Sequence, residues 1–304
     1  MVMHYPFSGI AQRGPLKWPE DHKVALILTL NLEHWDMTKD TDESYYAGGP
    51  PILPDVLPGR IPDFPNFTWR EYGQRVGIWR LFDVFRKAGV APGCTVNAKT
   101  LLERPEIAQV PKDEGWEVVA HNYEQGELLT GLGGDLAKER EIVEATLREY
   151  EKFYGRPAKG WLSSSLRGTP NTPEILVENG CIFFCDLLND DQPYMLETDA
   201  GPIVSTPYSN EINDFTILTR RGHTTDEMRD ILKEELTVLH REATEHGSGR
   251  MMNVGLHPHV TGRAYRSRAI SEFLEYAKTL DGVWFATREA IAEWYMDNNT
   301  GHIA

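Results

Sequence analysis

Residues 24–34 read VALILTLNLEH, an apolar run of seven residues that ends in polar side chains. A short apolar run with charged or turn-forming neighbours is typical of a strand buried on both faces of a parallel sheet. We therefore predict a strand over Val24–Leu30. Its carboxyl end carries Asn31, Glu33 and His34.

The same kind of run recurs along the chain and predicts seven more strands: Cys94–Asn97, Trp116–Ala120, Gly160–Ser164, Ile182–Cys185, Ile203–Thr206, Met252–Leu256 and Val283–Phe285. Helical periodicity lies between most of them, at Gly77–Lys87, Ala137–Tyr154, Thr224–His246 and Ser267–Leu280. This alternation indicates an α/β fold with a parallel sheet. The connection over residues 186–201 is expected to be a loop. The prediction is therefore a deformed, incomplete (β/α) barrel of about seven to eight parallel strands.

One domain over residues 1–304 is expected, with a long insertion at about 37–68 that is rich in Pro and Gly. A segment of this length without secondary structure is uncommon inside a compact domain. The first interpretation is a surface loop or an oligomer contact, and a homo-oligomer is expected. The alternative is a lid over the mouth of the barrel, because the segment leaves directly from the first strand.

Composition excludes some partners. The formal net charge of −15 argues against nucleic acid and against an anionic membrane surface, since both need a basic face. The three cysteines form no even framework, which favours a reducing compartment. No apolar run is long enough for a signal peptide or a membrane span, so a cytoplasmic protein is expected.

Polar residues follow seven of the predicted strands. They include Asn31 and Glu33, Asn97 and Lys99, His121 and Glu124, Ser163 to Ser165, Asp186, Tyr208 to Glu211, and His257 with His259. In α/β barrels the catalytic groups come from these strand ends, where the loops form the pocket. Seven polar ends in succession predict an active site there. No glycine-rich turn opens a helix as a nucleotide site requires, so a small-molecule substrate is expected.

Several segments together resemble the polysaccharide-deacetylase (NodB-like) superfamily, and in particular its branch of cofactor-independent allantoinases and cyclic-imide hydrolases. They are RPAKGW and LSSSLRGTPNT (156–172), EVVAHNYEQ (117–125), DLLNDDQPY (186–194), GLHPHVTGR (255–263), REYGQRVGIWRLFDVF (70–85) and DGVWFATREAIAEWY (281–295). The resemblance runs from about Trp18 to about Tyr295 and implies a deformed (β/α) barrel.

The superfamily also implies roles for particular residues. Glu33 matches the metal carboxylate of classical deacetylases, and Asn31 matches the position of their catalytic base. His121 matches the first metal histidine, Gln125 the second, and His257 the late catalytic histidine. Asn31 cannot take up a proton and Gln125 is a poor ligand. Both departures are shared with the allantoinase-like branch, so they argue against a sugar deacetylase.

The cofactor is left open between a divalent metal such as zinc and none. Glu33 and His121 could bind a metal with a third ligand from His257, and the other candidates for that third position are His34, Asp36 and Glu124. Without a metal, Glu33 would act as general base on water, with His121 or His257 as the acid. The expected catalytic residues are therefore Glu33, His121, His257 and Asn31.

The expected substrate-binding residues are Arg167, Trp161, Tyr208 and Glu124. Arg167 could clamp a ureido or carboxylate group, or form a loop salt bridge. Trp161 could stack on a flat ring, or belong to the core. Other polar residues nearby have structural interpretations: His259 is expected to be structural, and Asp190 and Asp191 to start a turn or, less simply, to orient a histidine.

The leading functional hypothesis is a hydrolase that opens carbon–nitrogen bonds in small cyclic amides, imides or ureides. The alternative is a metal-dependent N-deacetylase or deformylase that acts on an acyclic N-acyl substrate. A second alternative is a barrel that has lost its base and one ligand and only binds a metabolite.

Overall fold

The computed structural model describes residues 5–36 and 64–303. The predicted insertion falls mostly on residues 37–63, so its interpretation as a loop, contact or lid lies outside the described residues. Its last part, however, is not a loop. Residues 64–68 open helix α1 (Phe64–Tyr72), which continues through a π-helical turn, Gly73–Gly77, into α2 (Ile78–Ala88).

All eight predicted strands are present. They are β1 (Val24–Leu32), β2 (Gly93–Val96), β3 (Val118–Ala120), β4 (Gly160–Trp161), β5 (Phe183–Phe184), β7 (Gly201–Ser205), β8 (Arg250–Leu256) and β9 (Val283–Phe285). Their pairings are parallel, and the order runs β7-β5-β4-β3-β2-β1-β8, with β9 against the start of β1. Strand pairing does not join β8 back to the other end of the described sheet. The predicted deformed, incomplete barrel is confirmed.

The prediction that residues 186–201 form a loop is wrong in part. Residues Tyr194–Thr198 form a strand, β6, that pairs antiparallel with β7 through a tight turn at Asp199 and Ala200. Gly201 closes this turn with φ of 128°, a conformation that residues with a side chain rarely adopt. The hairpin adds an antiparallel strand at the open edge of the sheet. The sequence pattern was interpreted as parallel strands joined by helices, so this strand was not predicted.

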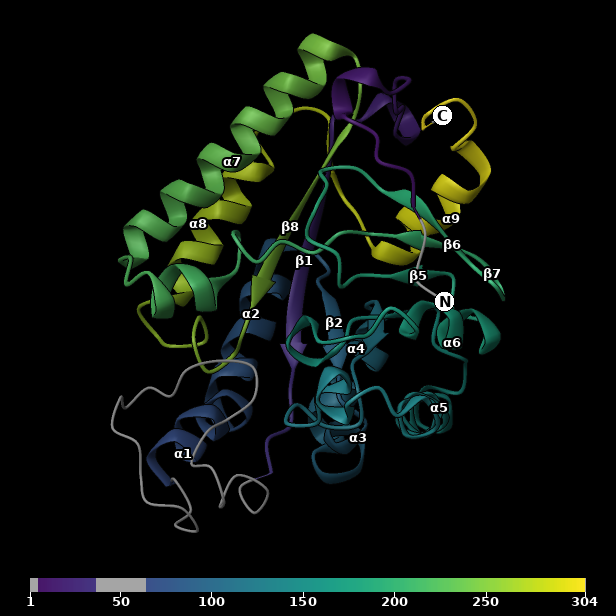
Figure 1. Cartoon of the computed structure of the whole chain (residues 1–304). Coiled ribbons are helices and arrows are strands. Elements are labelled where there is room, and N and C mark those ends of the chain that lie inside the picture. Colours follow the sequence, from purple (N-terminus) through teal and green to yellow (C-terminus); the bar gives the residue numbers. More distant parts are fainter. Residues whose placement is uncertain (1–4, 37–63, 304) are drawn as a thin grey trace.

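Helices cover the outer face of the sheet (Figure 1). The four predicted helices are present as α2, α5 (Leu136–Tyr154), α7 (Thr225–His246) and α8 (Ser267–Ala277). Figure 1 shows α7 and α8 packed along one side of β1 and β8. The remaining helices are α3 (Ala98–Glu103), α4 (Pro105–Glu114), α6 (Thr172–Glu178) and α9 (Arg288–Asn298). Within the described residues, no helix combines the length and apolar character needed to cross a bilayer.

Strand β1 explains how the barrel interior becomes polar towards one end. Every residue of β1 is buried, and alternate side chains point to opposite faces. Val24, Leu26, Leu28, Leu30 and Leu32 pack in the outer core beneath the helices. The other row, Ala25, Ile27, Thr29, Asn31 and then Glu33, faces the interior. Its chemistry changes from apolar to polar along the strand, so the carboxyl end of β1 delivers a carboxylate to the mouth of the barrel.

Candidate active site

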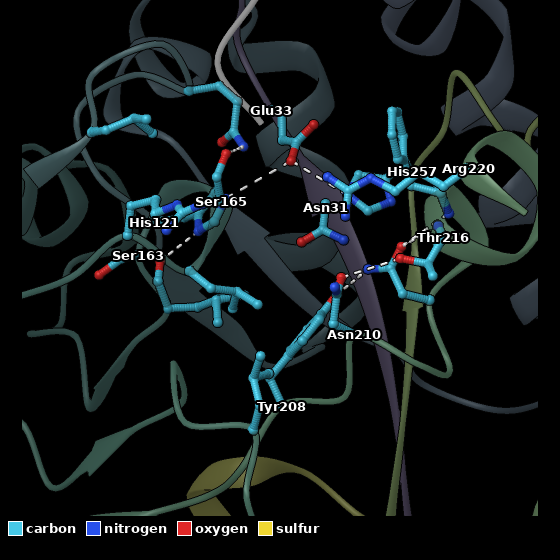
Figure 2. Close-up of a pocket in the computed structure, with 18 residues that line it drawn as sticks. Asn31, Glu33, His121, Ser163, Ser165, Tyr208, Asn210, Thr216, Arg220 and His257 are labelled. Carbon is cyan, nitrogen blue, oxygen red and sulfur yellow. Dashed lines mark hydrogen bonds and ion pairs between the residues drawn. The ribbon is translucent and has the colours of Figure 1, made fainter. Parts of the chain in front are cut away.

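A cavity of about 320 Å³ opens at the carboxyl ends of the strands. Figure 2 draws the residues that line it. They lie at the ends of six different parallel strands, β1, β3, β4, β5, β7 and β8, so the polar strand ends meet at one place. The lining consists of Asn31, Glu33, His121, Gln125, Leu128, Leu162, Ser163, Ser165, Leu166, Arg167, Leu188, Tyr208, Asn210, Asn213, Phe215, Thr216, Arg220 and His257.

Glu33 lies between two histidines at the centre of this cavity (Figure 2). Its Oε1 atom is 3.9 Å from Nε2 of His121 and 3.6 Å from Nε2 of His257. Its Oε2 atom is buried and has no hydrogen-bond partner in the described part of the chain. Burial raises the pKa of the Glu33 carboxyl, although His257 and Arg70 act in the opposite direction. A carboxylate in such a place is suited to accept a proton from water.

His121 follows β3 and is held from several directions. Its Nδ1 contacts the carbonyl oxygen of Leu162, so Nδ1 carries the proton and Nε2 presents a lone pair towards Glu33. The next residue, Asn122, has a positive φ of 46° and accepts a hydrogen bond from the Ser164 amide. Burial lowers the pKa of His121 to about 4. The imidazole is therefore neutral at physiological pH, and its Nε2 is available as a hydrogen-bond acceptor on the side of Glu33.

His257 follows β8, and its pKa is shifted in the opposite direction from that of His121. Its Nδ1 is 2.7 Å from Oδ1 of Asp214, a carboxylate that also accepts hydrogen bonds from the His257 amide and from the Thr261 hydroxyl. Burial is the largest single influence and lowers the pKa of His257. The carboxylates of Asp214 and Glu33 together outweigh it, so the pKa is raised. The raised pKa favours the protonated form of His257, whose Nε2 faces Glu33 and can then donate a proton.

Asn31 and Tyr208 form the floor beside these three groups. Asn31 accepts a hydrogen bond from Thr95 and donates one to the carbonyl oxygen of Leu256, so its amide is fixed and takes no proton. The Tyr208 hydroxyl accepts a hydrogen bond from Asn213 and packs so closely over Gly255 that a Cβ atom there would lie 2.0 Å from it. Burial raises the pKa of Tyr208, which keeps the phenol protonated.

The expected metal set, Glu33, His121 and His257, converges, but its spacing is wider than that of a tetrahedral zinc site. Ligand atoms on one tetrahedral zinc lie about 3.3 Å apart, shorter than both separations from Glu33. Gln125 stands at the cavity wall where a second imidazole would be needed, and its amide nitrogen lies 3.5 Å from Ser165 Oγ. Over residues 5–36 and 64–303, no three acidic, histidine or cysteine side chains are grouped as a metal site.

The other candidates for a third ligand are engaged elsewhere. His34 Nε2 is 2.9 Å from Glu103, and Lys99 bridges Asp36 and Glu124 at 3.0 and 3.1 Å. None of these three candidates lines the cavity. We therefore derive the chemistry of the site from its acid–base groups.

The expected substrate-binding residues divide into two pairs. Arg167 and Tyr208 line the cavity, whereas Trp161 and Glu124 do not. Trp161 is fully buried on the outer face of β4, because alternation along the strand turns Leu162 inward instead. Glu124 is buried in its ion pair with Lys99. The stacking role of Trp161 and the substrate contact of Glu124 are therefore corrected to structural roles.

Two functional residues were not singled out from the sequence. Asp214 orients His257, a role that the sequence offered to Asp190 or Asp191, whereas Asp190 pairs with Arg13 at 2.6 Å. The signal for Asp214 was weak, since it lies in a polar stretch after a strand end. Arg220, at the end of the π-helical segment Phe215–Arg220, also lines the cavity. His259 is buried against the Trp69 ring, as its structural interpretation expected.

Comparison with known proteins gives three similar chains. A curated protein of Schizosaccharomyces pombe described as a putative polysaccharide deacetylase is 27% identical over 307 residues, covering 91% of each chain. The crystal structure of a probable polysaccharide deacetylase from Pseudomonas aeruginosa PAO1 aligns with a TM-score of 0.85 and 27% identity, covering 97% of this chain and 99% of that one. The crystal structure of PuuE allantoinase gives the same TM-score, 0.85, and 27% identity, covering 97% and 98%.

No family model matches the sequence. A putative polysaccharide deacetylase from Mycobacterium smegmatis, at 22% identity and a TM-score of 0.75, supports the fold. These comparisons confirm the expected resemblance to the polysaccharide-deacetylase superfamily and to its allantoinase-like branch. They also confirm the expected class of enzyme, a hydrolase that acts on carbon–nitrogen bonds.

Proposed function

We propose, on the premise that this chain belongs with the polysaccharide-deacetylase superfamily, that it opens the ring of a small cyclic amide, imide or ureide by hydrolysis. One observation carries the proposal. A buried carboxylate, Glu33, lies between two histidines whose pKa values are moved in opposite directions, lowered for His121 and raised for His257. This is the arrangement that addition of water to an amide requires, with a base for water and an acid for nitrogen.

In the proposed mechanism a water molecule donates its hydrogens to Glu33 and to Nε2 of His121. Its oxygen attacks the ring carbonyl carbon while Glu33 takes one proton. The Tyr208 hydroxyl is a candidate donor to the oxyanion that forms, and Arg167 or backbone amides are the others. The carbon–nitrogen bond then breaks, its electron pair stays on nitrogen, and His257 Nε2 supplies the proton. The products are an amine or amide and a carboxylic acid, which releases its proton to solvent as a carboxylate, and solvent carries the proton of Glu33 back to His257.

Three features favour a ring over an acylated sugar. Asn31 replaces the carboxylate base of classical deacetylases with a fixed amide, and Gln125 replaces a metal histidine. The cavity of about 320 Å³ is at the lower end of the range for small-molecule sites, which suits a single ring.

The direct test is a screen of allantoin, hydantoin, succinimide and dihydrouracil, with ring opening followed by absorbance and by chromatography of the product. We expect turnover of at least one ring, and we expect it to survive prolonged treatment with a chelator.

The alternative is the metal-dependent N-deacetylase or deformylase, favoured by the names of the two similar deacetylases. Release of acetate from N-acetylglucosamine oligomers that stops after chelation, together with no turnover of any ring, would replace our proposal by this alternative.

The pH dependence of kcat/KM should be bell-shaped. Activity rises as Glu33 loses its proton, and the raised pKa of Glu33 places this limb above the usual value of 4.5. Activity falls as His257 loses its proton, and the raised pKa of His257 places that limb above 6.5. His121 is neutral between the two limbs, because its pKa is lowered to about 4. A rate profile measured from pH 4 to 10 that shows no basic limb would remove His257 as the acid.

A further inference from the structure

Two arginines line the cavity without a carboxylate partner. Arg167 follows the short helix Ser164–Leu166 after β4, and Arg220 ends the π-helical segment after β7. Both are exposed, and neither guanidinium forms a hydrogen bond or ion pair with another residue of the described chain. Arg220 has only the ring of Phe215 beneath it, at 5.4 Å from the ring centroid. Figure 2 shows Arg220 beside His257 at the edge of the cavity.

Many arginines of the described chain pair with a carboxylate, whereas Arg167, Arg220 and the exposed Arg241 do not. The chain has 46 acidic and 31 basic side chains, so an exposed arginine readily meets a carboxylate. Arg221, next to Arg220 in sequence, pairs with Glu211. Arginines elsewhere are paired in the same way, among them Arg13, Arg86, Arg140, Arg156, Arg229, Arg250 and Arg268. The guanidinium groups of Arg167 and Arg220 therefore have no ion-pair partner in the described chain and can contact a ligand in the cavity.

The charges around the cavity are positive although the whole protein is acidic. Glu33 is the one acidic side chain among the lining residues that the structure describes. Asp214, behind His257, offsets the charge of that imidazole. Glu33 is then opposed by two guanidinium groups, Arg167 and Arg220. Although the whole chain has a net charge of −15, the wall of the cavity is positively charged and can attract an anionic group of a ligand.

We propose that Arg220 and Arg167 bind a carboxylate group of the substrate, so that the enzyme acts on a cyclic amide, imide or ureide that carries this group. The inference rests on the proposed function for the kind of ring that is opened, and it adds that the substrate carries a negative charge. A guanidinium presents two parallel N–H donors that match the two oxygens of a carboxylate. The neighbouring side chains, Asn210 and Thr216, are neutral and hydrogen-bonded to each other at 3.2 Å, so they do not compete for the guanidinium charge.

The test separates binding of the charge from turnover of the ring. Cyclopentanecarboxylate and cyclopentyl methyl ketone have similar shapes, differ in charge and contain no carbon–nitrogen bond. By calorimetry we expect the carboxylate to bind the native protein at least about tenfold more tightly than the ketone. Arg220→Gln should reduce this preference to within about twofold, and Arg167→Gln should reduce it as well. Arg221→Gln removes an equal charge one residue away and outside the cavity, and it should retain the preference.

A kinetic comparison completes the test. Hydantoin-5-acetate should be opened with a higher kcat/KM than hydantoin, and Arg220→Gln should abolish the advantage mainly through KM. Equal binding of the carboxylate and the ketone, or an Arg220→Gln variant with the native preference, overturns the inference. Preferential binding of inorganic phosphate would overturn the carboxylate assignment. If the carboxylate preference is present while no ring is opened, the proposed function fails and the subsite stands.

Discussion

Replacing Glu33 by glutamine is expected to lower kcat/KM by about 10³-fold or more for whichever ring the native enzyme opens. Glutamine has nearly the same shape and keeps the cavity filled, but it cannot take a proton from water. The remaining candidate base is His121, whose pKa is lowered to about 4 because it is buried. An imidazole of such low basicity removes a proton from water poorly, so it cannot replace Glu33.

The Glu33→Gln variant also has a second expected effect. The Glu33 carboxylate helps to raise the pKa of His257, 3.6 Å away. Its removal should move the basic limb of the residual pH profile to lower pH. Glu211→Gln is the matched control, because Glu211 is exposed, follows a residue of the cavity wall and pairs with Arg221 outside it. If the activity of Glu33→Gln is within tenfold of that of the native enzyme, Glu33 is not the general base and another group has this role.

Replacing Asp214 by asparagine is expected to lower kcat by about 10²-fold to 10⁴-fold. Asp214 accepts hydrogen bonds from the His257 ring and from the His257 amide, each at 2.7 Å. Its negative charge raises the pKa of the His257 imidazole against the effect of burial. Asparagine retains the size of the side chain but loses the charge, so His257 should become neutral at physiological pH. The leaving nitrogen would then have no proton donor.

Asp214 is a positioning residue, and its test must exclude a loss of fold. The basic limb of the pH profile should move to lower pH in Asp214→Asn, which a purely structural defect would not produce. Thr261→Val removes one hydroxyl that donates to Asp214 and leaves the carboxylate in place. It should keep the native pH profile with a smaller loss of rate. An unchanged basic limb in Asp214→Asn, with native circular dichroism, would contradict the role given to Asp214.

These two predictions would distinguish the proposed acid–base mechanism from catalysis by a metal ion. A metal would activate water and polarise the carbonyl with one ion. Here the two tasks fall to separate groups whose pKa values are moved in useful directions. Burial raises the pKa of Glu33 and lowers that of His121, and carboxylates raise the pKa of His257. The replacement of a ligand histidine by Gln125 is consistent with this division of labour.

The sequence by itself determined the strands and the end of the sheet at which the chemistry lies. Both follow from local rules: the length of an apolar run, the alternation of side chains along a strand, and the meeting of parallel strands at their carboxyl ends. For this reason Glu33, His121 and His257 were identified correctly as neighbours. Of the two interpretations of Trp161, stacking on a ring or packing in the core, the structure supports the core, since Leu162 faces the cavity instead.

The tertiary structure alone decided which distant side chains meet. Asp214 is 43 positions before His257 in sequence, and nothing local distinguishes it from Asp190 or Asp191. The charge state of each histidine depends on burial and on the carboxylates of other segments, which no pattern encodes. Arg220 reaches the cavity because of the π-helical segment after β7, and its lack of a partner is a property of three-dimensional surroundings. Residues 24–34, VALILTLNLEH, thus determined where the Glu33 carboxylate lies. The packed barrel placed His257, His121 and the arginines of the cavity around it.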